Sequence, residues 1–259
     1  MNLNNMKARF AILGLVFLSL QSCSTQEKEL IWEEDFDGNS LNMDYWSYEN
    51  GDGCPDICGW GNNERQVYRP ENLEIKDGMA IITAEKDGDD YFSSRINTKE
   101  KFEFQYGTIE TRAKVPGGHG IWPAIWMLGD NIGEVGWPAS GEIDIMEYVG
   151  RMKDTLHTTL HTPATYGDNA STKVTKIDNV EDDFHVYKVE WSKDEIVYFI
   201  DGKKVYTFSP KVKDDEHYPF RHKFYFLLNM AIGGNFGGPE VDDSIFPTKF
   251  YIDYIKVYQ

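Results

Sequence analysis

The chain has 259 residues and a formal net charge of −17, with 43 acidic side chains against 26 Lys and Arg. This length suits one large β domain, whose core is big enough to need no disulfide framework. The acidic balance argues against a nucleic-acid partner, whose phosphates need a basic surface, and against a strongly anionic polysaccharide. Aromatic residues make up 14% of the chain, and we expect them both in the core and as exposed stacking surfaces.

The N-terminal segment has the pattern of a secretory signal peptide. Lys7 and Arg9 precede an apolar stretch at residues 10–18. That stretch is shorter than the about 20 residues that a membrane-spanning helix takes, so we expect residues 1–22 to be a signal peptide outside the fold.

A second N-terminal feature is the run Leu-Gln-Ser-Cys at residues 20–23. It resembles a bacterial lipoprotein box, which implies cleavage before Cys23 and lipidation of its thiol. An ordinary signal peptide followed by an incidental Cys is the alternative. We expect residues 23–29 to be a polar tether and residues 30–259 to be one domain. The lipid would hold it at a bacterial membrane, with the outer membrane expected, facing either the periplasm or the outside.

Two further cysteines, Cys54 and Cys58, have three residues between them. Export would let them oxidise, and a turn can bring their Cα atoms within the roughly 4.4–6.8 Å that a disulfide needs. A zinc site is the weaker alternative, because the sequence offers no second Cys pair and no clear pair of histidines nearby. We therefore predict a Cys54–Cys58 disulfide that shapes a local turn.

Short strand-like runs, broken by turn residues, recur along the rest of the chain. They lie at residues 79–84, 106–115, 186–191, 196–200, 203–208 and 250–258. Asp201-Gly202 between two of these runs is a strong hairpin signal. No long amphipathic helix stands out. The pattern predicts an all-β sandwich of two antiparallel sheets.

The run Gly-Glu-Ile-Asp-Ile-Met-Glu at residues 141–147 carries three acids. In a regular strand Glu142 and Asp144 share one face, whereas Glu147 would point into the core, where an unpaired carboxylate is costly. One extra residue, a β-bulge near Met146, would return Glu147 to the face of the other acids. We therefore predict a bulge.

Crowded carboxylates separate in pKa, because like charges resist ionising together. Glu142 would then serve as a nucleophile, Glu147 as a general acid and later base, and Asp144 as their hydrogen-bonded neighbour. Retaining glycosidases place two carboxyl groups about 5–5.5 Å apart. A solvated acidic face and a calcium site are the alternatives. Trp122, Trp126 and Trp137 lie just upstream and favour a sugar-binding surface.

The acid run resembles the E-x-D-x-x-E signature of glycoside hydrolase family 16. The runs at 107–126, 184–191 and 229–234 are similar to family landmarks in the same order. The resemblance implies a concanavalin-A-like β-jelly roll, a concave sheet with the catalytic cleft, and a retaining mechanism. The extra residue, here Met146, is typical of laminarinases, agarases and carrageenases. The overall pattern is most similar to the laminarinases, which are endo-β-1,3-glucanases.

The resemblance also implies roles for individual residues. It makes Trp122, Trp126 and Trp137 sugar platforms, with core packing as the alternative for Trp126. It places His161 near the acid/base, with a plain surface histidine as the alternative. The implied polar sugar contacts are Asn62, Glu64, Arg112 and Asn229.

Many family members hold a structural calcium ion far from the catalytic residues. The matching ligands would be the backbone carbonyls of Glu34 and Gly78 and the side chain of Asp253. Oxygen-only ligands suit this ion. We expect no cofactor for catalysis.

The sequence predicts an enzyme that acts as a monomer on β-glucan and touches a membrane only through its lipid. The choice between β-1,3-glucan and mixed-linkage β-1,3-1,4-glucan stays open. Alternative functions are a carbohydrate-binding surface lipoprotein without catalysis, an agarase-like galactan hydrolase, and a structural or adhesive lipoprotein whose acids are only a solvated face.

Overall fold

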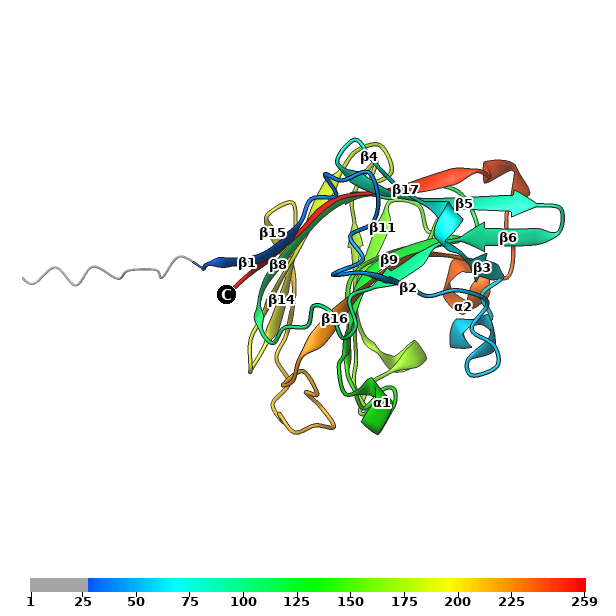
Figure 1. The fold of residues 1–259 in the computed structure, drawn as a ribbon. Helices are drawn as coiled ribbons and strands as arrows, with labels where there is room; N and C mark the ends of the chain where they lie inside the picture. Colours follow the sequence, from blue (N-terminus) through cyan, green and yellow to red (C-terminus); the bar gives the residue numbers. More distant parts are fainter. Residues whose placement is uncertain (1–27) are drawn as a thin grey trace, which may run out of the picture.

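The computed structural model describes residues 28–259 as two stacked β sheets (Figure 1). The predicted signal peptide, Cys23 and most of the predicted tether lie outside the described residues. Within residues 28–259, no helix has the length and apolar character needed to cross a membrane.

One sheet has ten strands, in the order β15-β14-β13-β8-β17-β5-β6-β3, with β1 paired to β17 and β4 paired to β5. Their bounds are Leu30–Glu34 (β1), Gln66–Tyr68 (β3), Leu73–Lys76 (β4), Met79–Asp87 (β5), Asp90–Ser93 (β6), Gly107–Lys114 (β8), His185–Trp191 (β13), Ile196–Ile200 (β14), Lys203–Phe208 (β15) and Thr248–Tyr258 (β17). The pairing of β3 with β6 is parallel.

The other sheet has seven strands, in the order β12-β11-β10-β9-β16-β7-β2. Their bounds are Ser47–Tyr48 (β2), Arg95–Asn97 (β7), Ile121–Gly129 (β9), Glu142–Tyr148 (β10), Thr155–His161 (β11), Ser171–Lys176 (β12) and Phe224–Ile232 (β16). All its neighbouring strands run antiparallel. The predicted two-sheet sandwich is therefore confirmed.

Helices are short and lie in the connections. They are α1 (Ile132–Val135), α2 (Gly234–Gly237) and the 3₁₀ turns η1 (Cys58–Gly61), η2 (Pro70–Asn72), η3 (Gly167–Asn169) and η4 (Asp243–Ile245). Two of them begin where runs noted in the sequence end: η1 begins at Cys58, and α2 begins at Gly234, the last residue of the run 229–234. Both lie beside the candidate active site described below.

The core forms between the sheets because side chains alternate along each strand. In β8, Ile109 and Ala113 are fully buried, whereas Glu110 and Arg112 lie on the outer side. Aromatic rings fill much of the space, and Trp32 stacks on Phe102 with 4.3 Å between ring centroids. The expected aromatic core is thus present.

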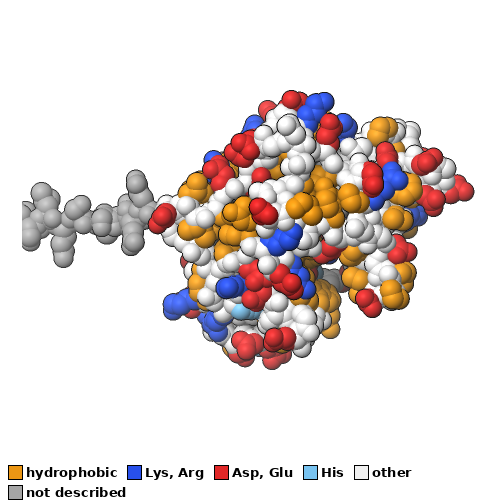
Figure 2. Space-filling model, viewed as in Figure 1, with side chains coloured by type: hydrophobic (Ala, Val, Ile, Leu, Met, Phe, Trp, Pro, Cys, Tyr) orange, Lys and Arg blue, Asp and Glu red, His pale blue; other side chains and the backbone are white. Residues whose placement is uncertain are grey.

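The two ends of the described chain meet at the edge of the ten-stranded sheet (Figure 1). Glu29 and Gln259 exchange both backbone hydrogen bonds, at 2.7 and 2.9 Å, where β1 runs beside β17. Asp and Glu side chains are spread over the visible surface, with Lys and Arg among them (Figure 2). On this face the acidic side chains are therefore not gathered into a single patch.

Candidate active site

The three acids of β10 lie on the outer face of the seven-stranded sheet, which we call the cleft face. Against β9, Asp144 pairs with Trp126, Met146 pairs with Ile125, and the register shifts between these two rungs. The register against β11 shifts at the same place. The predicted bulge is therefore confirmed, and it returns Glu147 to the cleft face.

The residues between the acids seal the core beneath them. Ile143, Ile145 and Met146 are at most 1% exposed and belong to the central hydrophobic cluster. Asp144 is 3% exposed and Glu147 is 8% exposed, so the bulge does not push either carboxylate out into open water. Asp144 and Glu147 are thus nearly buried, and the residues beneath them are fully packed in the core.

Burial and a neighbouring negative charge favour the protonated form of Glu147, and they outweigh two hydrogen bonds that favour its carboxylate. Trp122 Nε1 donates to one carboxylate oxygen at 3.1 Å, and Thr159 Oγ1 donates to the other at 3.1 Å. Burial raises the pKa of Glu147 to about 8, and the charge of Asp144 adds to the effect. His161 is the largest opposing influence on this pKa. Glu147 can therefore carry a proton near neutral pH, as a general acid must.

Asp144 lies between the other two acids. Its burial, and next the charge of Glu142, hold the pKa of Asp144 well above its usual range. A protonated Asp144 can donate a hydrogen bond to an ionised Glu142. This state agrees with the predicted supporting role of Asp144.

His161 faces two of the acids. Its Nε2 lies 3.6 Å from Glu142 Oε1 and 3.3 Å from Asp144 Oδ2. Gly167 donates its backbone N–H to His161 Nδ1 at 3.2 Å. Because Nδ1 accepts, the neutral ring carries its hydrogen on Nε2, directed at the carboxylates. His161 therefore lies closest to the predicted nucleophile side rather than to Glu147, whose partner on β11 is His157.

The three predicted tryptophan platforms all reach the cleft face. Trp137 is 47% exposed and donates its Nε1 hydrogen to Glu142 Oε2 at 2.8 Å. Trp126 is half-buried against a small apolar cluster on this face, separate from the central core. Its Nε1 donates to Asn229 Oδ1 at 2.8 Å. Core packing, the alternative for Trp126, is thus not what the structure shows.

A polar network continues from Asn229 toward the edge of the site. Asn229 Nδ2 donates to the Tyr68 hydroxyl at 3.0 Å, and that hydroxyl donates to Glu64 Oε2 at 3.2 Å. Asn62 Nδ2 donates to Glu64 Oε1 at 3.1 Å. The predicted sugar contacts Asn62, Glu64 and Asn229 are therefore brought together, and Tyr68 links them.

Arg95 belongs to this site although sequence reasoning missed it. Its guanidinium carbon lies 4.4 Å from the Trp60 ring centroid and 5.0 Å from that of Trp126, and it forms an ion pair with Glu49. Arg95 is the largest influence that opposes the burial-driven rise in the pKa of Glu64. Strand β7 is only three residues long, which is too short for an alternating pattern of apolar and polar residues to predict where the Arg95 side chain lies.

The predicted disulfide lies in the loop that leads into the polar network. The structure pairs Cys54 with Cys58, whose Cα atoms are 4.2 Å apart. Trp60 follows in η1 and contacts Arg95 as described above. The loop therefore delivers one aromatic ring to the edge of the site.

Arg112 does not belong to the cleft face. It lies on β8 in the ten-stranded sheet, on the outer side, where it forms an ion pair with Asp253 and covers Phe184. The prediction that Arg112 contacts sugar is therefore wrong. The resemblance aligned the strand, but it did not show which of the two sheets held it.

The same ion pair bears on the predicted calcium ligands. Glu34 lies opposite Ile255 and Ala80 lies opposite Ile252, so the strand register brings Glu34, Gly78 and Asp253 near one another. Asp253 supplies the only predicted carboxylate, however, and it is already neutralised by a guanidinium. Arg112 therefore competes with calcium for this carboxylate, and the calcium site stays a prediction.

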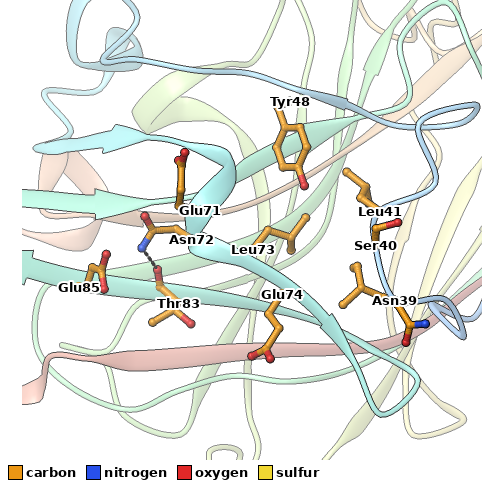
Figure 3. Close-up of a pocket in the computed structure, with 11 residues that line it drawn as sticks. Asn39, Ser40, Leu41, Tyr48, Glu71, Asn72, Leu73, Glu74, Thr83 and Glu85 are labelled. Carbon is orange, nitrogen blue, oxygen red and sulfur yellow. Dashed lines mark hydrogen bonds between the residues drawn. The ribbon is translucent and has the colours of Figure 1, made fainter.

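Two other groups of acidic side chains lie in or near the seven-stranded sheet and β4. Glu142, Asp144 and His161 offer ligand atoms within 4.8 Å of one another, but a metal ion there would cover the predicted nucleophile. A surface hollow of about 580 Å³ lies beside β4, with Glu71, Glu74 and Glu85 among its lining residues (Figure 3). None of the three acids of β10 lines it.

Comparisons with known proteins agree with this geometry. The family model described as glycosyl hydrolases family 16 matches residues 61–255. The crystal structure of a laminarinase from Flavobacterium sp. UMI-01 is 56% identical, with a TM-score of 0.88, over 89% of this chain and 100% of that one.

Two curated relatives extend the comparison. A beta-glucanase of Rhodothermus marinus is 38% identical over 100% of this chain and 97% of its own length. A glucan endo-1,3-beta-glucosidase A1 of Niallia circulans is 36% identical over 89% of this chain, which spans 38% of that longer protein. With the bulged acid strand in place, the chain belongs to the glycosyl hydrolases family 16.

Proposed function

We propose that the chain hydrolyses β-1,3-glucan internally, as a retaining endo-β-1,3-glucanase. The observation that carries the proposal is the pair of unlike glutamates on one face of β10. Glu142 receives a hydrogen bond from an exposed indole, whereas burial raises the pKa of Glu147 to about 8. Relatives described as a laminarinase and as an endo-1,3-beta-glucosidase support the substrate.

In the first step, a Glu142 oxygen attacks the anomeric carbon of the sugar. The bond from that carbon to the glycosidic oxygen breaks, and Glu147 gives its proton to the departing oxygen. A glycosyl ester of Glu142 remains, and Glu147 is left as a carboxylate. Asp144 and His161 Nε2 face Glu142 and stabilise its charge before the attack.

In the second step, the Glu147 carboxylate takes a proton from water while the water oxygen attacks the anomeric carbon. The ester bond breaks and Glu142 regains its negative charge. The charge of Glu142 is one of the causes that raise the pKa of Glu147. The neutral ester removes that cause and lowers the pKa of Glu147, so the group is held as a carboxylate when it must act as a base.

The first test measures reducing-end release from laminarin by the wild type and Glu142→Ser. We expect the variant to lose essentially all activity. Glu190→Ser, on a strand of the ten-stranded sheet, is the matched control and should behave as the wild type. Equal activity in the wild type and Glu142→Ser would sink the assignment. Proton NMR of the first product should show the β anomer, as retention requires.

Linkage preference is the finer part of the proposal. We propose that β-1,3-glucan is preferred over mixed-linkage glucan, because the signature with its extra residue is most similar to that of laminarinases. Product profiles on laminarin, lichenan and agarose measure this directly. Faster cleavage of lichenan or agarose than of laminarin would contradict it.

We propose acid–base chemistry without a catalytic cofactor. The structural calcium ion implied by the resemblance stays a prediction, since calcium would have to take the Asp253 carboxylate from Arg112. A calcium-dependent melting temperature that disappears in Asp253→Asn would support the ion. The same melting temperature in calcium and in EDTA would contradict the predicted calcium ion.

We also propose that a lipid on Cys23 anchors the protein to a bacterial membrane, and that the body acts as a monomer. The support is the sequence of residues 1–29. Labelled palmitate should enter the wild type and not Cys23→Ser, and the variant should leave the membrane fraction. Equal membrane association of both would contradict the anchor, and light scattering of the soluble variant tests the monomer.

A further inference from the structure

The carboxyl group of Glu147 has an aromatic cover that comes partly from outside the sheet. Trp122, which bonds Glu147, meets the ring of Phe236 edge-on at 5.3 Å. His157, which lies opposite Glu147 on β11, meets the same ring at 4.9 Å. One phenyl ring therefore contacts both aromatic neighbours of the acid.

Phe236 lies in α2, just after β16, and the backbone holds it there. Arg151 Nε donates to the Phe236 carbonyl at 2.9 Å, and Asn235 donates its N–H to the Asn62 carbonyl at 2.7 Å. Gly237 lies beside Trp122, since an added Cβ there would be 3.5 Å from the Trp122 side chain, an ordinary van der Waals distance. The short helix is thus held against β9 and β16, with the Phe236 ring on Trp122.

We propose that Phe236 is a positioning residue for Glu147: its ring holds Trp122 and His157 against this carboxyl group and keeps water away from it. The inference deepens the proposed glucanase function and rests on it. It assigns to the connection after β16, which carries none of the acids, control over the proton that cleaves the glycosidic bond.

The cover works only because it carries no charge. Burial, and next the positive charge of Arg151, lower the pKa of His157 to about 4, so its ring is neutral when the enzyme works. A cationic ring there would stabilise the Glu147 carboxylate and favour loss of its proton. His157 Nδ1 is buried without a hydrogen-bond partner among the described residues, so no hydrogen bond within them orients this nitrogen.

The charged groups that face Glu147 are smaller causes of its raised pKa than burial is. Asp144 and Glu142, on its own strand, raise its pKa, whereas His161 on β11 lowers it. Removing the Phe236 ring should therefore reduce the burial of Glu147, the largest cause of its raised pKa, and leave the acids in place.

The experiment compares the pH dependence of kcat/KM on laminarin for the wild type, Phe236→Ala and Phe236→Leu. We expect the basic limb to move from near 8 toward about 7 in Phe236→Ala and to stay near the wild type in Phe236→Leu, which keeps an apolar cover. At acidic pH, kcat of Phe236→Ala should approach the wild-type value. Phe199→Ala, a half-buried ring on β14, is the control and should leave the limb unchanged.

A basic limb in Phe236→Ala that matches the wild type would overturn the inference, as would an equal shift in Phe199→Ala. A second measurement needs no activity. Glutamate labelled at the side-chain carboxyl carbon is titrated by NMR, with the Glu147 signal assigned by its loss in Glu147→Gln. The titration midpoint should fall in Phe236→Ala. If laminarin is not cleaved at all, the glucanase proposal fails while this titration still decides the role of Phe236.

Discussion

Glu142 and Glu147 have the same side chain but different neighbours, and the neighbours assign their roles. Trp137, which bonds Glu142, is exposed, so substrate and water reach this side of the site. Glu147 is 8% exposed and lies under aromatic rings. Burial disfavours the charged form, so the less accessible acid is the one that keeps its proton.

The pKa of Glu147 predicts the alkaline side of the activity profile. Because its folded-state pKa is raised to about 8, kcat/KM on laminarin should fall as the pH rises through this value. In Glu147→Gln, an aryl glycoside with a good leaving group should still form the glycosyl ester at a rate independent of pH between 6 and about 9. Stopped-flow release of the aryl group measures this. A basic limb that persists in Glu147→Gln would show that another group sets it.

The same raised pKa has a consequence for stability. The neutral form of Glu147 contributes stability that is fully present below the unfolded pKa of about 4.5. That contribution is lost as the pH rises through about 8. We therefore expect the free energy of unfolding of the wild type, relative to that of Glu147→Gln, to be higher at acidic pH than at alkaline pH. Unfolding titrations at both pH values measure this difference.

Azide can separate the roles of the two glutamates. In Glu142→Gly, azide fits the space of the lost nucleophile and attacks from its side, which gives an α-glycosyl azide from an activated aryl substrate. In Glu147→Gly, the ester still forms on Glu142 and azide replaces water, which gives the β-glycosyl azide. Carbon and proton NMR distinguish the products. A β-glycosyl azide from Glu142→Gly and an α-glycosyl azide from Glu147→Gly would reverse the roles assigned to the two glutamates.

Strand β10 reverses its alternation at one residue. Before the bulge, Ile143 and Ile145 face the core and Asp144 faces the cleft; after it, Glu147 faces the cleft and Tyr148 faces the core. Sequence reasoning predicted this reversal, because a buried carboxylate was the costly alternative. A free-energy argument at one residue thus located an irregularity in the strand.

Deletion of Ile145 together with Met146 tests the reversal, because deletion of Met146 alone would restore a regular alternation that keeps Glu147 on the cleft face. Glu147 would turn into the core and Tyr148 onto the cleft face, so activity should vanish and the free energy of unfolding should fall by about 3 kcal/mol or more. Met146→Leu keeps the residue count and a similar volume, so it should keep activity and most of the stability. Activity on laminarin and urea unfolding are the measurements. An active deletion variant would contradict the geometry.

The polar network shows what local patterns cannot reveal. Tyr68, Arg95 and Asn229 come from β3, β7 and β16, and the first two strands are three residues long each. Asn229 was found through its landmark, whereas Arg95 had neither a landmark nor a periodic neighbour. Its role depends on two aromatic rings contributed by distant segments, which only the folded chain brings together.

The two sheets divide the work of the molecule. The cleft face of the seven-stranded sheet carries the three acids and the rings predicted to face sugar. The ten-stranded sheet carries the two paired ends of the described chain and the Arg112–Asp253 pair. Alternation along a strand predicts which residues share a face. It does not say whether that outer face belongs to the cleft, which is why Arg112 was misplaced.

Arg112→Met tests this division. Because Arg112 lies outside the cleft, kcat/KM on laminarin should stay within about twofold of the wild type. Its ion pair is more than a third exposed on the Arg112 side, so the free energy of unfolding should fall by only about 1 kcal/mol or less. Arg95→Met is the matched comparison and should impair activity strongly. A large activity loss in Arg112→Met would return this residue to the site.

The indole hydrogen bonds limit what the tryptophans can distinguish in a sugar. Trp122, Trp126 and Trp137 each direct their single N–H to a protein oxygen. They offer a ring face to the substrate and no donor with which to sense whether a hydroxyl is axial or equatorial. Discrimination between glucose and its epimers therefore falls to the polar side of the site, where Glu64 and Arg95 lie, and changes in epimer preference should map there.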